Sequence, residues 1–284
     1  MQHNDYILTL SCPDRTGIVY HVSGLLYELQ CNILDAQQFG DEETGRFFLR
    51  VHFDLPQAVA EADLRSRLGQ LAEDFAMQWQ LHDARRRARL LILVSRQGHC
   101  LNDLLFRTRS GQLRADVAAI VSNHTDHEPL ARSYGIPFHH LPVTPETKPE
   151  QERRLLELVQ AENIDLVVLA RYMQILSPEL CRALAGRAIN IHHSFLPSFK
   201  GARPYHPAHA RGVKLIGATA HYVTPDLDEG PIIEQDIERV DHSMSPQDLA
   251  QVGSDIESLV LARAVSYHVE HRILLNGHRT VVFR

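Results

Sequence analysis

Apolar residues recur along the first 83 residues with the alternating spacings of strands and helices. The expected strands lie at 6–10, 32–39, 46–55 and 77–82. One expected helix, at 18–29, follows the first strand, and the other, at 57–75, precedes the last strand. An acidic, glycine-ended turn at 41–45 joins the two middle strands and favours a hairpin. The resulting βαββαβ order predicts a small ferredoxin-like α+β domain over residues 1–83, with helices on one face of an antiparallel sheet.

Beyond residue 89 the pattern changes to continuous apolar runs separated by helical stretches. The runs lie at 90–94, 115–121, 165–170, 188–191 and 218–223. Strands that are apolar throughout are typical of a mainly parallel sheet covered on both faces, so we expect an α/β domain over 89–284 after a linker at 84–88. Ligands of such sheets bind outside the carboxyl ends of the strands. Ser245-Pro246 begins a long helix, and Asn276-Gly277 centres a terminal hairpin.

Composition narrows the possible partners. A chain of 284 residues suits two domains, and 29 Lys and Arg against 35 Asp and Glu leave a net charge of −6. This charge disfavours a nucleic-acid binder, so we interpret the arginines at 85–87 and 89 as a solvated linker. The sequence has no apolar run near ~20 residues, no signal-like start and only four scattered cysteines. We therefore expect a cytoplasmic protein without a membrane or nucleic-acid partner.

The most reactive side chains lie at strand ends of the second domain. Asn190 and His192 are two residues apart at the end of an apolar run, so they project to the same face. An amide donor beside an imidazole can polarise a carbonyl and stabilise the oxyanion that it becomes, although both side chains could simply cap backbone groups. His221 closes the next run, and Asp228 precedes a Gly-Pro turn. A carboxylate beside His192 would hold the imidazole, whereas most loop acids are merely solvated.

Two other kinds of site are disfavoured. The histidines between 192 and 221 form a loose cluster without a recognised metal-ligand spacing, so we expect no metal. The turn at 95–103 follows the first strand of the second domain, where a phosphate cradle would lie. It contains one glycine, Gly98, together with His99 and Asp103, which argues against a dinucleotide or P-loop site.

Several motifs are similar to known families. The run Asn190-Ile191-His192-His193-Ser194-Phe195-Leu196-Pro197-Ser198-Phe199-Lys200-Gly201, with the later His221-Tyr222-Val223-Thr224 and Asp228-Glu229-Gly230-Pro231, resembles the 10-formyltetrahydrofolate formyltransferase family. Residues 10–19 resemble an ACT domain, a module that senses amino acids. An ACT domain before a formyltransferase-like domain resembles the formyltetrahydrofolate deformylase family, as do residues 98–105 and 200–205.

The resemblance implies a Rossmann-like formyltransferase domain that hydrolyses 10-formyltetrahydrofolate to formate and tetrahydrofolate, supplying formate for purine synthesis and balancing one-carbon folate pools. It implies Asn190, His192 and Asp228 as catalytic residues, with His221 as a helper, and no cofactor besides the folate substrate. A folate pocket is implied at Arg171, Tyr172, Met173, Gln174, Ile175 and Leu176, although such apolar side chains otherwise pack in a core. In the ACT domain it implies an amino-acid effector at Asp14, Arg15, Thr16 and Gly17, and assembly into a dimer or tetramer, although the domain could instead serve dimerisation alone.

Three alternatives share this resemblance. A formyltransferase acting on an amine such as glycinamide ribonucleotide would use the same catalytic residues but needs a phosphate nest after the first strand of its domain. A transfer-RNA formyltransferase would carry a further C-terminal domain and a basic face. A non-catalytic sensor built on the same fold would have lost some of the reacting residues, and Asn190, His192 and Asp228 are all present.

Overall fold

The computed structural model describes residues 4–196 and 205–284 and divides the chain into two compact units. The first unit comprises Met1–Arg87 and Glu270–Arg284, and the second comprises Ala88–Val269. The motif residues at 197–204 lie outside the described residues.

The first unit contains the expected βαββαβ arrangement. Its elements are β1 (Asn4–Pro13), α1 (Ile18–Glu28), β2 (Asn32–Asp41), β3 (Arg46–Leu55), α2 (Glu61–Phe75) and β4 (Gln78–Asp83). The strands pair antiparallel in the order β2-β3-β1-β4, which confirms the predicted fold class. Helix α2 begins four residues later than expected, because the chain first turns after Pro56, whose carbonyl accepts the N–H of Val59.

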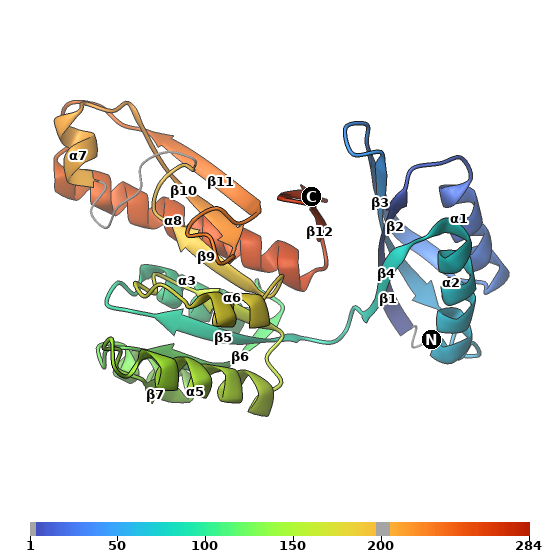
Figure 1. Ribbon diagram of the computed structural model, residues 1–284, viewed down its shortest axis with the longest axis horizontal. Helices are drawn as coiled ribbons and strands as arrows, with labels where there is room; N and C mark the ends of the chain where they lie inside the picture. Colours follow the sequence, from blue (N-terminus) through green and yellow to red (C-terminus); the bar gives the residue numbers. More distant parts are fainter. Residues whose placement is uncertain (1–3, 197–204) are drawn as a thin grey trace. The chain divides into compact units, whose positions relative to one another are not determined.

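The two faces of this sheet have different partners because side chains alternate along each strand. Helices α1 and α2 lie against one face (Figure 1), where alternate β3 residues such as Leu49, Val51 and Phe53 enter the main core. Phe48 on β3 instead belongs to a small cluster with Val281 and Phe283 near the C-terminus. The second face is therefore covered by the end of the same chain.

A C-terminal hairpin provides this cover. It consists of β12 (Ile273–Asn276) and β13 (Arg279–Val282). The buried guanidinium of Arg50 donates to the carbonyls of Glu270 and His271 and to the carboxylate of Asp35, at 3.0–3.2 Å. The expected second domain at 89–284 therefore differs from the observed unit: the terminal hairpin forms as predicted but packs with the first unit, because a sheet face that would otherwise meet solvent needs an apolar partner.

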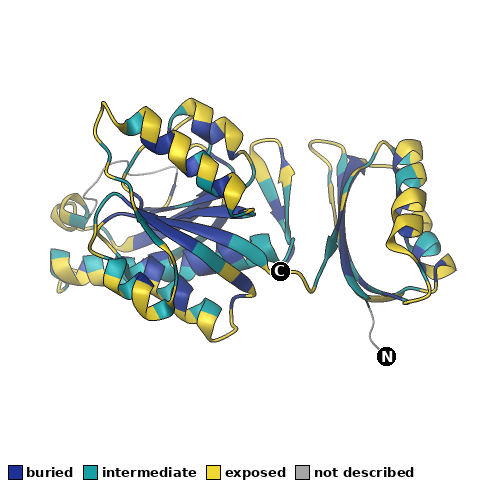
Figure 2. Ribbon diagram, turned by 90° about the horizontal axis from the view of Figure 1, so that it is seen from below, coloured by how far each residue is buried: buried dark blue, intermediate teal, exposed yellow. Residues whose placement is uncertain are grey.

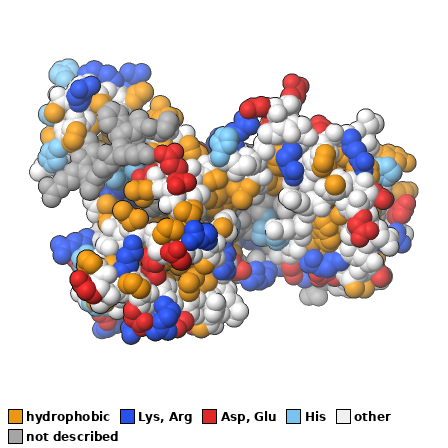
Figure 3. All heavy atoms as spheres, viewed as in Figure 1, with side chains coloured by type: hydrophobic (Ala, Val, Ile, Leu, Met, Phe, Trp, Pro, Cys, Tyr) orange, Lys and Arg blue, Asp and Glu red, His pale blue; other side chains and the backbone are white. Residues whose placement is uncertain are grey.

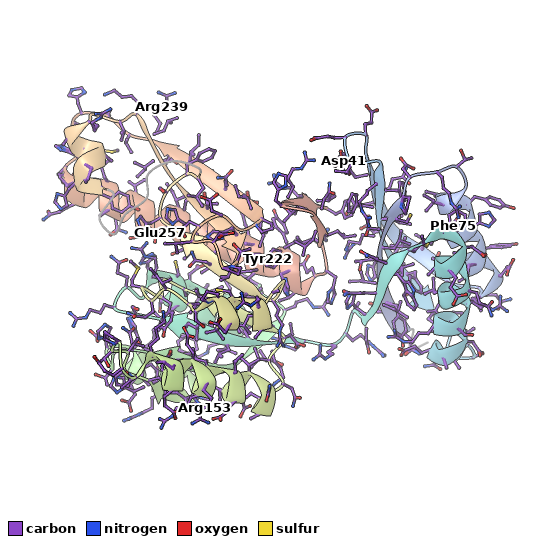
Figure 4. All side chains as sticks on the ribbon, in the orientation of Figure 1. Asp41, Phe75, Arg153, Tyr222, Arg239 and Glu257 are labelled. Carbon is purple, nitrogen blue, oxygen red and sulfur yellow. The ribbon has the colours of Figure 1, made fainter. Side chains whose placement is uncertain are left out.

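A polar contact also holds this hairpin. Asn276 donates to the carboxylate of Asp41, at the end of β2, and Arg279 donates to Glu43 at 2.9 Å. Asp41 is labelled in Figure 4. Hydrogen bonds from Thr44 and then Asn276 hold the pKa of Asp41 below its usual range.

The second unit is a mixed, mostly parallel α/β domain. Its strands are β5 (Ala88–Val94), β6 (Ala115–Ser122), β7 (Phe138–His140), β8 (Leu166–Leu169), β9 (Ala188–His192), β10 (Leu215–Tyr222) and β11 (Ile232–Arg239). Its helices are α3 (His99–Arg109), α4 (Glu128–Tyr134), α5 (Lys148–Ala161), α6 (Pro178–Ala183), α7 (Tyr205–Ala210) and α8 (Pro246–Val269). The sheet order is β11-β10-β9-β8-β5-β6-β7, with β10 antiparallel to both of its neighbours.

The core of the second unit lies on the parallel strands. Strands β5 and β8 are almost wholly buried, whereas the covering helices expose one side (Figure 2). Positive and negative side chains are interspersed over the face drawn in Figure 3. Among the described residues, no helix is both long and apolar enough to cross a membrane. The cytoplasmic location stays a prediction.

Candidate active site

A cavity of about 300 Å³ opens at the carboxyl ends of β8 and β9. These strands are parallel neighbours, so the residues that follow them meet at one edge of the sheet. The predicted catalytic residues Asn190, His192, His221 and Asp228 all line this cavity. The rest of its wall is mainly apolar, from Leu169, Met173, Ile175, Leu176, Val223, Pro225 and Leu227.

Strand pairing brings Asn190 and His221 together. The two residues are direct partners in the antiparallel β9–β10 ladder, and the Asn190 Nδ2 and His221 Nε2 atoms are 3.2 Å apart. His221 Nδ1 lies 2.9 Å from the carbonyl of Tyr222. Because a carbonyl only accepts, this nitrogen carries a proton and donates. The Nε2 side of His221 therefore faces the Asn190 amide.

His192 and Asp228 form the second half of the site. His192 Nδ1 is 3.4 Å from Asp228 Oδ2, and both side chains are largely buried. The other ring nitrogen, Nε2, is buried and has no hydrogen-bond partner among the described residues. A buried polar atom without a partner in a cavity wall is unusual and suits a group that contacts substrate.

Asp228 is held in place by both backbone and electrostatics. Its φ of 58° lies in the left-handed region, which Asp and Asn tolerate better than most residues. The contact with His192, and then that with His221 at 3.7 Å, holds the pKa of Asp228 well below its usual range, against the opposing effect of burial. The carboxylate is therefore ionised at neutral pH and places a negative charge beside His192.

The six predicted folate-pocket residues all border the cavity, but their side chains differ. Met173 and Ile175 are exposed at its mouth, and Gln174 is half-buried. Leu176 and Tyr172 belong to the core, where the Tyr172 hydroxyl accepts a hydrogen bond from Gln151 at 2.9 Å. Burial raises the pKa of Tyr172 to about 12. The Arg171 side chain is buried, and its guanidinium contacts polar side chains rather than the apolar wall.

The predicted effector residues form an exposed turn before α1. The N–H of Asp14 donates to the carbonyl of Gly45 at 2.8 Å. The guanidinium of Arg15 lies 4.0 Å above the Phe75 ring and donates to the carbonyl of Asp74. Thr16 is exposed, and Gly17 has a φ of 98° that favours glycine. These contacts hold the turn in front of α1, and the ligand that it would bind stays a prediction.

Sequence reasoning missed three residues beside this site: Gln97, Tyr205 and Glu257. Glu257 lies inside α8, is labelled in Figure 4, and contacts His99 and Tyr205. Its neighbours at helical spacing, Gly253, Val260 and Leu261, are buried. The sequence therefore did contain a signal for Glu257, because an acidic residue on the apolar face of a helix is unusual.

Two family models match the chain. Residues 88–265 match the formyl transferase family model, and residues 6–69 match the ACT domain model. The chain is 51% identical over 280 residues to the formyltetrahydrofolate deformylase of Corynebacterium sp. strain P-1, covering 98% of each chain.

Solved structures are similar over the same ranges. The crystal structure of formyltetrahydrofolate deformylase from Burkholderia mallei superposes with a TM-score of 0.94 at 54% identity, covering 99% of this chain and 100% of that one. Glycinamide ribonucleotide transformylase 1 from Symbiobacterium toebii superposes with a TM-score of 0.65 at 31% identity, covering 70% of this chain and 95% of that one.

Proposed function

Since the chain belongs to the formyltetrahydrofolate deformylase family, whose reaction is hydrolysis of 10-formyltetrahydrofolate to formate and tetrahydrofolate, we propose that Asn190, His192 and Asp228 carry out this reaction in the cavity of the second unit. The observation that carries the proposal is the buried, unpartnered Nε2 of His192, which lies in the cavity wall with Asn190 and Asp228. The expectation that the formate serves purine synthesis stays a prediction.

We expect the substrate to contact both apolar and polar side chains of the cavity wall. The exposed side chains of Met173 and Ile175 would contact the flat pterin ring, and Gln174 would meet a polar edge of it. Apolar walls with a few placed polar groups are typical of small-molecule sites. The formyl group would then lie against Asn190 and His192.

The attack of water develops negative charge on the formyl oxygen. Asn190 Nδ2 and His192 Nε2 are the donors that would stabilise this charge. When His221 Nε2 is unprotonated it accepts one N–H of the Asn190 amide, and the second N–H is then directed to the substrate. His221 is therefore a positioning residue for Asn190.

Collapse of the tetrahedral intermediate releases the products. The new bond joins the water oxygen to the formyl carbon, the bond from that carbon to N10 breaks, and a proton from water ends on N10. Asp228 holds His192 through Nδ1 and is the group that we expect to relay this proton. Because the pKa of Asp228 is held low, the carboxylate would carry the proton only in transit.

The test measures both products with and without an acceptor. The purified protein is incubated with 10-formyltetrahydrofolate, in the presence or absence of glycinamide ribonucleotide, and formate and tetrahydrofolate are quantified together. Equal amounts of the two products without acceptor are the expected result. Turnover that requires glycinamide ribonucleotide and yields no formate would instead indicate a transferase.

We further propose that the ACT domain binds a small amino-acid effector at the turn of Asp14, Arg15, Thr16 and Gly17 and pairs between copies of the chain. The position of this turn before α1 supports binding of a carboxylate by backbone N–H groups. The edge strand β2, with exposed Leu34 and Phe39, supports pairing. Sedimentation equilibrium at micromolar concentration tests assembly, and a monomer there would contradict it. Activity assays with a panel of amino acids test the effector.

A further inference from the structure

A cluster of polar side chains around a buried ion pair lies beside the proposed catalytic residues and has no part in the proposed chemistry. We call it the Arg171 cluster; its members are Gln97, His99, Arg171, His193, Tyr205 and Glu257. Arg171 and Glu257 are 5% and 1% exposed. The six residues come from six places in the second unit: the β5–α3 connection, the start of α3, the ends of β8 and β9, and helices α7 and α8.

Glu257 is the negative centre of the cluster. Its Oε2 accepts from His99 Nε2 at 2.7 Å and lies 3.3 Å from Arg171 Nε, and its Oε1 accepts from the Tyr205 hydroxyl at 2.9 Å. Burial alone would raise the pKa of Glu257, but the hydrogen bond from His99 and the charge of Arg171 outweigh it, so the pKa lies below its usual value. Both carboxylate oxygens are therefore engaged, and the charge is balanced by the protein itself.

A metal ion is a poor occupant for this place. His99, Cys100 and Glu257 have ligand atoms within 4.8 Å of one another. However, burial raises the pKa of the Cys100 thiol far above its usual range, and metal binding needs the thiolate. Nε2 of His99 is already bonded to Glu257. The cluster is thus better described as an internal ion pair with polar neighbours.

Arg171 is held in a conformation that its own backbone disfavours. Its φ is 64°, in the left-handed region, and its carbonyl accepts the N–H of Ser95 at 3.2 Å. Glycine would adopt this conformation without strain. The side chain is instead fixed by Gln97 Oε1, 2.7 Å from Nε, and by His193 Nδ1, 2.6 Å from Nη1. Backbone strain that the surroundings maintain is typical of functional positions.

The cluster also forms part of the wall next to the reacting groups. Arg171 and His193 line the same cavity as Asn190 and His192. The rings of His192 and His193 are stacked, with centroids 4.9 Å apart and planes at 20°. The β5–α3 connection and the first residue of α3 lie where a fold of this kind would hold the phosphate of a substrate, and they supply Gln97 and His99 to the cluster. Side chains thus occupy the edge of the sheet where a second substrate would enter.

We propose that the Arg171 cluster excludes amine nucleophiles from the formyl group and so makes water the acceptor, an inference that rests on the proposed function. With an amine in place of water, a nitrogen–carbon bond would form, the bond from the formyl carbon to N10 would break, and an amine proton would end on N10. The products would be a formamide and tetrahydrofolate. The chemistry at Asn190, His192 and Asp228 is the same in both cases. Only the space beside them, which Arg171 and His193 take up in the cavity wall, separates the two outcomes.

The similarity to a transformylase supports this proposal. The Symbiobacterium toebii protein superposes on 70% of this chain at 31% identity, and its name describes formyl transfer to glycinamide ribonucleotide. A fold that serves both kinds of reaction requires residues that select the acceptor. Arg171 is therefore a specificity-determining residue.

The experiment compares two products of one active site. The protein and its Arg171→Gly variant are incubated with 10-formyltetrahydrofolate and either hydroxylamine or glycinamide, and formate and the formylated amine are quantified after subtraction of the enzyme-free reaction. We expect the ratio of formylated amine to formate to rise at least about tenfold in Arg171→Gly. This ratio does not depend on the fraction of protein that is folded, so a partly unstable variant still reports on selection.

Two further variants complete the design. Arg171→Gly combined with Glu257→Gln removes both charges of the ion pair and carries the test where the single variant does not fold. Arg96→Gly makes the same substitution at an exposed residue of the neighbouring turn, outside the cluster, and should change neither the ratio nor the rate of formate release.

The outcomes distinguish this inference from the proposed function. A hydrolytically active Arg171→Gly or double variant with the same product ratio as the unmodified protein would overturn the inference, as would formylation of both amines by the unmodified protein at the variant's rate. Absence of formate release by the unmodified protein without any amine would overturn the proposed function itself.

Discussion

Replacing Asp228 by Asn tests the catalytic assignment with little disturbance of the fold. The substitution removes the negative charge but keeps the shape of the side chain. Asn tolerates the left-handed backbone that Asp228 adopts at a φ of 58°, so the loop should keep its conformation. Ala at this position would add backbone strain and confuse the two effects.

The distances set the expected magnitude. Asp228 Oδ2 lies 3.4 Å from His192 Nδ1. Unit charges at that separation interact by about 5 kcal/mol in an effective dielectric of about 20, which is an upper limit for the support that protonated His192 draws from the carboxylate. Since each ~1.4 kcal/mol is a factor of ten in rate, the limit is between about 10³ and 10⁴ in kcat. We expect Asp228→Asn to lose at least about 10².

The assay follows formate release at saturating and limiting 10-formyltetrahydrofolate, with circular dichroism as the test of folding. Because the pKa of Asp228 is held far below neutrality, its carboxylate is ionised throughout the assay range, and the assay pH does not itself remove this charge from the unmodified protein. Asp226→Asn is the matched control, because this acid is exposed in the same loop and does not border the cavity. A folded Asp228→Asn protein with near-normal kcat would show that Asp228 has no part in the chemistry.

Three other predictions follow from the same structure. Asn190→Ala and His192→Ala should each lower kcat by about 10²–10³ with the fold retained, because each removes an oxyanion donor; formate release tests this, and a loss confined to KM would contradict it. Arg50→Met should lower the free energy of unfolding by about 2–4 kcal/mol, because it leaves Asp35 and the carbonyls of Glu270 and His271 without their buried donor; an unchanged urea midpoint would refute the anchoring role of Arg50. Burial, followed by the charges of Arg65 and Arg86, lowers the pKa of His82 to about 4, and its ring stacks on His271 at 3.5 Å. The unfolded chain therefore binds the proton first, so this contribution to stability is complete above about pH 6.5 and is lost progressively toward about pH 4, by up to about 3 kcal/mol. Urea unfolding of His82→Gln should show a weaker decline over this range than the unmodified protein, and equal declines would contradict the assignment.

Local pattern was sufficient for most of the secondary structure. The expected strand at 46–55 coincides with β3, and the long helix begun by Ser245-Pro246 ends at Val269. The differences are that α2 begins four residues later than expected and that β7 and β11 have no counterpart among the expected apolar runs. Helix ends depend on capping and turn geometry, which periodicity does not report.

The proposed catalytic residues were accessible to sequence reasoning through their motif, but their geometry was not. Alternation placed Asn190 and His192 on one face, whereas the pairing of Asn190 with His221 depends on the register of two antiparallel strands. The sequence also showed the loss of glycines after the first strand of the second domain. It did not show that Gln97 accepts a hydrogen bond from Arg171 or that His99 contacts the buried Glu257.

The sequence by itself thus determined the order of elements, the two fold classes and the residues able to react, because propensity, hydrophobic period and motif spacing act over short stretches of chain. Tertiary structure decided that the last fifteen residues cover the first unit, that Arg50 binds their carbonyls, and that Arg171 pairs with Glu257. The physical reason is that a buried charge or an open sheet face must find a partner wherever folding brings one. That partner can lie more than 200 residues away, and no local pattern encodes its distance.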